Sequence, residues 1–260
     1  MTTANDLIPI VTEAADLLLD VYSPDARPEG RTYMFAAAER NEKLVLDRLR
    51  PALERLRPSA RWLDDELETT PLPPGEFWVV DAVEGNVNHV HGMPEWCVTI
   101  TLIIDSEPVL TVIRQPIGDH TYTATRGEGA FHNGERLRAS AKTDLDAAIV
   151  STGQAETGQP GTHRRIGASI TAMLDSALVV RAFVPSTFPM LLLAAGQHDV
   201  FWQFEPVLPG VAPGLLLVTE AGGVATRIDG SPWRPGASDV LVAAPGLHRA
   251  AVDVLSAVAR

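Results

Sequence analysis

The sequence predicts an α+β protein: two helices, then a largely antiparallel sheet, then alternating strands and helices. Three observations support this. Apolar residues recur at helical spacing through the first 57 residues, strand-like runs follow from residue 61, and the second half alternates short apolar strands with helices. A run of helices followed by a run of strands is typical of α+β or layered α/β/α architectures.

Two helices account for the first 57 residues. Apolar residues recur at helical spacing from Ile8 to Val21, and the turn-forming segment 22–25 ends this pattern. A second helix is expected from Ala36 to about Leu56. Pro51 is predicted to kink or split it, because proline removes a helical hydrogen bond.

From Arg61 the period changes to that of strands. The expected strands are 60–63, 77–80, 98–104, 109–113, 121–125 and 130–131. Turn residues separate them, so neighbouring strands are expected to pair in an antiparallel manner.

The second half alternates between strands and helices. Strands are expected at 148–151, 178–183, 200–204 and 240–243, and helices at 164–174, 190–195, 213–221 and 247–258. No linker is visible, so residues 1–260 are predicted to form one domain with two halves, roughly 1–145 and 146–260.

Composition limits the function classes. The 33 acidic residues outnumber the 21 basic ones, for a formal net charge of −12. Nucleic acid and anionic membranes both attract a basic face, so neither is an expected partner. The single cysteine, the lack of a signal-peptide pattern and the lack of a long apolar run predict a cytoplasmic, acidic, globular protein.

The segment with the clearest chemistry is 77–92. An apolar strand ends at Asp81, and Glu84 follows three residues later beside Gly85. A strand that ends in a tight glycine turn can direct two carboxylates and a backbone carbonyl into one cavity, and Mg²⁺ prefers such oxygen donors. On these residues alone, a solvated turn between strands remains an equally good interpretation.

This segment resembles the signature of the inositol monophosphatase family, in which a strand precedes D-P-(I/L)-D-G-T. The resemblance extends to four further blocks, at 125–135, 193–199, 218–223 and 239–244. It implies a five-layered αβαβα fold, a homodimer, and Mg²⁺-dependent hydrolysis of phosphate monoesters.

The resemblance also implies site residues. Asp65, Asp81, Glu84 and the carbonyl of Val83 match metal ligands. Glu39 and Asn86 fall where the family has an aspartate and a threonine that orient the attacking water.

The sequence departs from the family at these positions. Counting without gaps places Gly210 where a metal-binding aspartate is usual, and Glu205 is the carboxylate five residues before it. Three Asp/Glu exchanges alter the reach of the remaining ligands, and the Asn86 amide cannot relay a proton as a hydroxyl can. Mg²⁺ is therefore expected to bind weakly, with one ion at most, or not at all.

The substrate side differs as well. A small polar loop of the family corresponds to Val184, Pro185 and Ser186, and its hydroxyl-binding residue corresponds to Gln203. Gly85 and Gly210 complete the expected substrate-binding set. Since this loop is apolar, a bulkier and less phosphorylated ligand is expected.

Three functions follow as hypotheses. The preferred one is metal-poor or metal-free acid–base chemistry, a cyclisation, isomerisation or elimination, on a non-phosphorylated metabolite. The candidate catalytic residues are Glu39, Asp65, Asp81, Glu84, Asn86 and His89. The alternatives are a Mg²⁺-dependent phosphomonoesterase and a non-catalytic binding pseudoenzyme.

Overall fold

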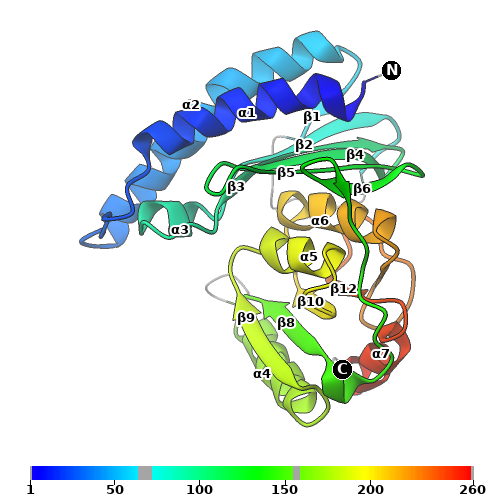
Figure 1. Cartoon of the computed structure of the whole chain (residues 1–260). Helices are drawn as coiled ribbons and strands as arrows, with labels where there is room; N and C mark the ends of the chain where they lie inside the picture. Colours follow the sequence, from blue (N-terminus) through cyan, green and yellow to red (C-terminus); the bar gives the residue numbers. More distant parts are fainter. Residues whose placement is uncertain (1, 64–71, 155–158, 259–260) are drawn as a thin grey trace.

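The computed structural model describes residues 2–63, 72–154 and 159–258, which form five alternating layers of helix and sheet (Figure 1). Helices α1 (Ala4–Val21) and α2 (Arg31–Leu56) cover the outer face of the first sheet. Helices α5 (Thr187–Ala194) and α6 (Leu208–Glu220) separate the two sheets, and α4 (Pro160–Leu174) and α7 (His248–Ser256) cover the second. The predicted α+β class and the αβαβα layering are confirmed.

The first sheet has its strands in the order β1-β2-β3-β4-β5-β6-β7. All neighbours pair antiparallel except β1 and β2, which are parallel. The strands are β1 (Arg61–Trp62), β2 (Glu76–Glu84), β3 (Cys97–Ile104), β4 (Glu107–Gln115), β5 (His120–Thr125), β6 (Gly129–His132) and β7 (Glu135–Arg136). The short helix α3 (Asn86–Val90) follows β2 directly.

The second sheet is mixed, in the order β11-β12-β10-β8-β9. Strand β8 pairs in parallel with both β9 and β10, whereas β12 pairs antiparallel with β10 and β11. The strands are β8 (Ile149–Gly153), β9 (Val179–Phe183), β10 (Val200–Phe204), β11 (Val224–Thr226) and β12 (Asp239–Ala243), and a 3₁₀ turn (Leu145–Ala147) precedes them. The division into halves near residue 145 falls between the two sheets and stays a prediction.

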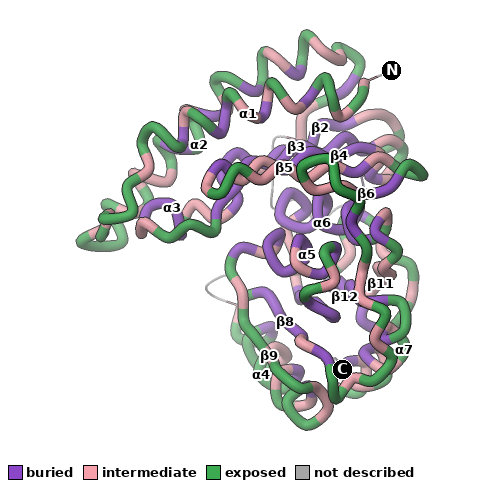
Figure 2. Tube along the Cα trace, in the orientation of Figure 1, coloured by how far each residue is buried: buried purple, intermediate pink, exposed green. Residues whose placement is uncertain are grey.

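Buried apolar clusters fill the spaces between successive layers, and the middle layers have the most completely buried elements. Strands β10 and β12 are buried throughout, and so is α6 as far as Val218, whereas α1, α2 and α4 each expose one side (Figure 2). An apolar helix that is buried on all sides is expected only where protein surrounds it. The α5–α6 layer therefore has a sheet on each side. The loops before these two helices lie close to the end of β2.

Four predicted helices begin earlier in the structure than expected, among them α4 at Pro160 instead of Arg164 and α5 at Thr187 instead of Met190. Helix α2 begins at Arg31, five residues before the predicted start, and it continues through Pro51 to Leu56 without a split. Helix α6 begins at Leu208 instead of Pro213. In α6, proline at the second helical position needs no intrahelical partner for its nitrogen, so Pro209 is compatible with the early start.

Among the described residues, no helix is long and apolar enough to cross a membrane.

His198, just before β10, gives the fold a predicted pH dependence. It is 2% exposed, with Nδ1 3.4 Å from Ser151 Oγ and Nε2 3.3 Å from Arg181 Nη1. Burial, helped by the positive Arg181, lowers its pKa to about 4. Because the unfolded chain binds this proton more tightly, stability is expected to fall by about 3 kcal/mol as pH drops from 6.5 to 4.

Urea unfolding of wild type and His198→Gln at pH 7 and pH 4 measures this contribution. The variant is expected to lose less stability on acidification, and His163→Gln, at an exposed position on α4, is the control. An equal pH response in wild type and His198→Gln would contradict the prediction.

Candidate functional site

Asp81 and Glu84 lie together at the end of β2 because the strand bulges there. Asp81 pairs with Thr99 and Glu84 with Cys97, so three steps along β2 match two along β3. Side chains three apart on a regular strand point to opposite faces, and a bulge resets this alternation. The two carboxyl groups are consequently hydrogen-bonded to each other.

The environment of this pair favours one shared proton. Burial, followed by the charge of Glu84, raises the pKa of Asp81 well above its usual range. Glu84 is 7% exposed, and its Oε1 accepts a hydrogen bond of 2.8 Å from the backbone N–H of Thr187 at the start of α5. A backbone donor favours the ionised form of the acid that accepts it.

Gly85 turns the chain from β2 into α3. It has φ +89°, and a Cβ there would lie 2.6 Å from the carbonyl oxygen of Glu95 and 3.0 Å from Pro185 Cγ. A glycine is required by both the left-handed backbone and the close approach. This turn brings the 184–186 loop against the acidic pair.

The loop before α5 gathers the expected substrate-binding residues. Ser186 Oγ donates to Gln203 Oε1 at 2.7 Å, and Thr187 Oγ1 donates to the carbonyl oxygen of Gly210 at 3.0 Å. A Cβ on Gly210 would lie 3.7 Å from Glu84 Oε2. Gly210 thus faces Glu84 across a gap that no side chain from position 210 fills.

Asn86 is held by two neighbours on α2. Its Nδ2 donates to the carbonyl oxygen of Ala38 at 2.9 Å, and its Oδ1 accepts from Asn41 Nδ2 at 3.0 Å. Asn41 is 8% exposed and also lies 3.0 Å from His89 Nδ1. These bonds fix the amide of Asn86 and join α2 to α3.

His89 does not fit its expected acid–base role. Its Nε2 donates to the carbonyl oxygen of Leu18 at 3.0 Å while Nδ1 accepts from Asn41. Burial lowers the pKa of this imidazole. With both ring nitrogens bonded and the ring packed between Tyr22 and Trp96, His89 fits a structural role that ties α1 to α3.

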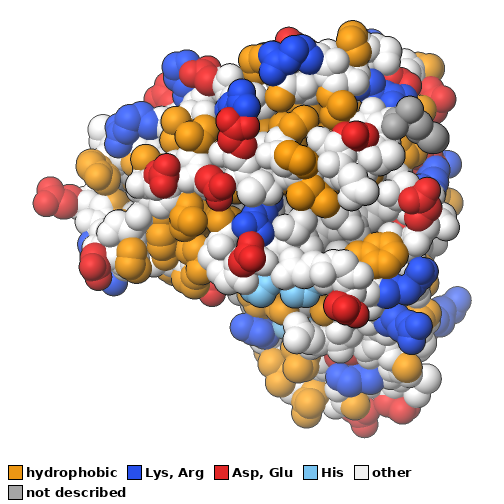
Figure 3. Space-filling view, turned by 45° about the horizontal axis from the view of Figure 1, so that its top comes forward, with side chains coloured by type: hydrophobic (Ala, Val, Ile, Leu, Met, Phe, Trp, Pro, Cys, Tyr) orange, Lys and Arg blue, Asp and Glu red, His pale blue; other side chains and the backbone are white. Residues whose placement is uncertain are grey.

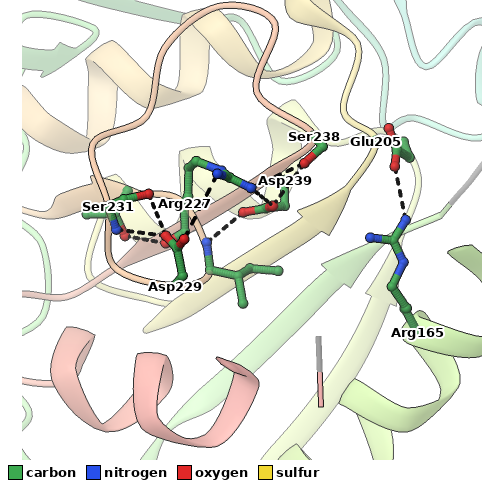
Figure 4. Close-up of polar contacts among 9 residues, drawn as sticks. Arg165, Glu205, Arg227, Asp229, Ser231, Ser238 and Asp239 are labelled. Atoms are coloured by element: carbon green, nitrogen blue, oxygen red, sulfur yellow. Dashed lines mark hydrogen bonds and ion pairs between the residues drawn. The ribbon is translucent and has the colours of Figure 1, made fainter. Parts of the chain in front are cut away.

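Glu39, another expected site residue, is not brought to the pair. Glu39 is exposed on α2, and no contact with Asn86 is found for it among the described residues; the side chain that contacts Asn86 is Asn41. Asp65 lies outside the described residues. Glu205 Oε1 accepts from Arg165 Nη2 at 3.0 Å (Figure 4), so this carboxylate is paired with α4.

Sequence reasoning missed Asn41, Thr187 and Glu42. Asn41 and Glu42 lie one helical turn after Ala38, on the face of α2 that meets Asn86, and the charge of Glu42 contributes to the raised pKa of Asp81. The spacing i, i+3, i+4 from Ala38 is the signal that could have found them. Nothing in the sequence pairs Thr187 with Glu84, which is 103 residues away.

Comparison with known proteins decides the family. The model of the inositol monophosphatase family matches residues 5–259. An inositol-1-monophosphatase of Rhizobium meliloti (strain 1021) is 32% identical over 199 residues, which are 76% of this chain and 73% of that protein. The chain belongs to the inositol monophosphatase family.

Two further members of the inositol monophosphatase family extend the comparison. Inositol monophosphatase 2 of Solanum lycopersicum is 34% identical over 218 residues, covering 78% of this chain and 79% of that protein. The structure of inositol monophosphatase from Anabaena (Nostoc) sp. PCC 7120 covers 98% of this chain and 95% of its own, with a TM-score of 0.80. At 23% identity that structure supports the fold alone.

The inositol monophosphatase family implies Mg²⁺, so the donor set of this chain is informative. The end of β2 offers the carboxylates of Asp81 and Glu84 and the carbonyl of Val83. Position 210, beside Glu84, offers no donor side chain. In residues 2–63, 72–154 and 159–258 no group of three or more His, Cys, Asp or Glu side chains able to hold a metal is found.

Proposed function

We propose that this inositol-monophosphatase-family enzyme performs acid–base chemistry on a non-phosphorylated small molecule. The observation that carries the proposal is the contact between the Asp81 and Glu84 carboxyls opposite Gly210, which adds no third acid. A pair of acids whose surroundings differ can divide the roles of acid and base. Cyclisation, isomerisation and elimination can each use such a pair.

The two roles follow from the hydrogen bonds. Glu84, which accepts the Thr187 N–H, is the base that removes a proton from the substrate. Asp81, which holds the shared proton, donates it to the leaving or rearranging group. In each turnover Glu84 gains a proton and Asp81 loses one. The pair returns to its starting state when the proton passes from Glu84 to Asp81.

The cavity beside the 184–186 loop suits a substrate without phosphate. A cavity of about 390 Å³ lies at the carboxyl ends of β8 and β9, next to the 184–186 loop. Ligands commonly bind at the carboxyl ends of parallel strands. Its walls include Ile166, Phe183 and Val184, and no Lys or Arg is among its described lining residues. Phosphate recognition normally uses such cations, whereas apolar walls suit an uncharged group.

The available oxygen ligands limit how many Mg²⁺ ions the site could hold. Mg²⁺ prefers octahedral coordination by oxygen at about 2.1 Å. Asp81, Glu84 and the Val83 carbonyl would hold one ion and supply it with part of its ligand sphere. A second ion would lack the carboxylate at position 210, so we expect weak binding of one ion at most.

The second candidate is a Mg²⁺-dependent phosphomonoesterase. It is favoured by the relatives named inositol monophosphatases, which are 32% and 34% identical to this chain. Hydrolysis would need a group that orients the attacking water. Asn86 stands at that position, but its amide already bonds to Ala38 and Asn41. A cytoplasmic location and a homodimer stay predictions from sequence.

A Gly210→Asp variant separates the two functions. The new carboxylate reaches Glu84, so we expect Mg²⁺ affinity to rise about tenfold by calorimetry. Phosphate release from inositol and sugar phosphates is expected to stay at background, because Glu84 and Asn86 are unchanged. Gly167→Asp, on α4 with open space around it, is the matched control.

Wild-type chain assayed with and without EDTA completes the test. Rapid Mg²⁺-dependent phosphate release by the wild type would establish the phosphomonoesterase and contradict our proposal. Strong hydrolysis gained only by Gly210→Asp would show that the missing ligand was the sole defect. Substrate binding with no turnover in either medium would favour the pseudoenzyme.

A further inference from the structure

Helices α1, α2 and α3 form a lobe at one side of the molecule (Figure 1). A second cavity, of about 410 Å³, lies between the segment that joins α1 to α2, helix α2 itself and the last two residues of α3, His89 and Val90. Neither Asp81 nor Glu84 lines it. Exposed apolar side chains mark the same lobe, among them Val21, Tyr33 and Phe35, and Figure 3 shows hydrophobic groups gathered there.

The charges around this cavity are unusual for this chain. Arg27 and Arg40 both line it, and none of its described lining residues is acidic. The whole chain carries a net charge of −12, so a basic cavity stands out against an acidic background. Such a cavity attracts anions even when the protein as a whole repels them.

The two guanidinium groups are available to a ligand in different ways. Arg27 Nη1 donates to the carbonyl oxygens of Pro24 and Ala26 at 3.0 and 2.6 Å, which fixes the group and leaves its other nitrogens free to donate. Arg40 has no hydrogen bond or ion pair in the described part of the chain. A planar guanidinium binds carboxylate, sulfate and phosphate through paired N–H donors.

The remaining walls are mostly apolar. Val21, Pro28 and Leu44 are among its lining residues, and Tyr33 adds an aromatic ring with a hydroxyl. A volume of this size is within the range of small-molecule sites. We propose that this cavity is a binding site for a small organic anion, with its charged group at Arg27 and Arg40 and its apolar body against these walls.

A ligand here would contact the network that holds Asn86. Asn41 and His89 both line the cavity, and Asn41 donates to Asn86. Binding is therefore expected to change the NMR signals of the Asn41 and Asn86 side-chain amides. This inference uses none of the residues assigned to acid–base chemistry and stands independently of the proposed function.

The test uses benzoate, with benzamide as a neutral probe of the same shape and inorganic sulfate as an anion without an apolar body. Binding to the full chain is measured at low ionic strength by NMR titration. We expect benzoate to bind, and benzamide and sulfate to bind at least about tenfold more weakly. Arg27→Ala/Arg40→Ala is expected to weaken benzoate binding about tenfold or more, while Arg55→Ala, which removes one charge elsewhere on α2, leaves it unchanged.

Three results would overturn the proposal. One is benzoate binding that the double variant does not weaken, and another is benzoate and benzamide binding equally well. The third is no binding of benzoate at all. Circular dichroism of each variant shows that a loss of binding is not a loss of fold.

Discussion

Replacing Gly85 by alanine is expected to destabilise the fold by about 3 kcal/mol or more and to disorganise the acidic site. The residue has φ +89°, and its added Cβ would lie 2.6 Å from the Glu95 carbonyl oxygen, which is backbone and cannot rotate away. Left-handed strain alone costs alanine about 1 kcal/mol, and the overlap adds to it. Urea unfolding followed by circular dichroism measures the loss.

Gly127→Ala is the matched control for this prediction. Gly127 also has a positive φ, of +80°, but a Cβ there would meet nothing within 4 Å. It is expected to cost only the strain. If Gly85→Ala and Gly127→Ala were equally destabilising, the close packing of Gly85 on Glu95 would not be important for stability.

Removing either acid of the pair is expected to abolish turnover of the natural substrate. Asp81→Asn and Glu84→Gln each take away one proton-transfer group, which is worth about 10² to 10⁴ in rate. Measurement of kcat/KM for the variants tests this. Glu42→Gln, which removes the exposed neighbouring acid on α2, is expected to retain most activity.

Asp81→Asn, which is expected to lower activity, is expected to raise stability. Since the pKa of Asp81 is raised in the folded chain, metal-free stability falls as pH rises from the unfolded value of 3.8 toward the folded one. Asp81→Asn lacks this loss and is expected to unfold at a higher temperature than wild type at pH 7 in EDTA. A lower unfolding temperature would show that the Asp81–Glu84 contact stabilises the fold.

The sequence located the parts of the site that a local pattern determines. Asp81, Glu84 and Gly85 lie on one strand and its turn, so they could be identified as one segment, but the strand continues to Glu84 and the bulge that brings the two carboxyls together was not visible in the sequence. The α+β class was equally accessible, because the hydrophobic period changes visibly at residue 61.

Helix faces were harder to predict. Successive residues on a helix are about 100° apart, so an error of one or two positions selects a different face. The resemblance to the family put Glu39 at the site, whereas the face that meets Asn86 carries Ala38 and Asn41. The bond from Thr187 to Glu84 joins distant parts of the chain, and only the layered packing brings them together.

The hydrogen bonds from Leu18 through His89 and Asn41 to Asn86 have a mechanical consequence. They link the last turn of α1 and the middle of α2 to the first residue after the acidic turn, so the lobe and the site amide are joined by one chain of hydrogen bonds. Replacing Asn41 would break this chain in the middle and leave the Asn86 amide with only its bond to the Ala38 carbonyl.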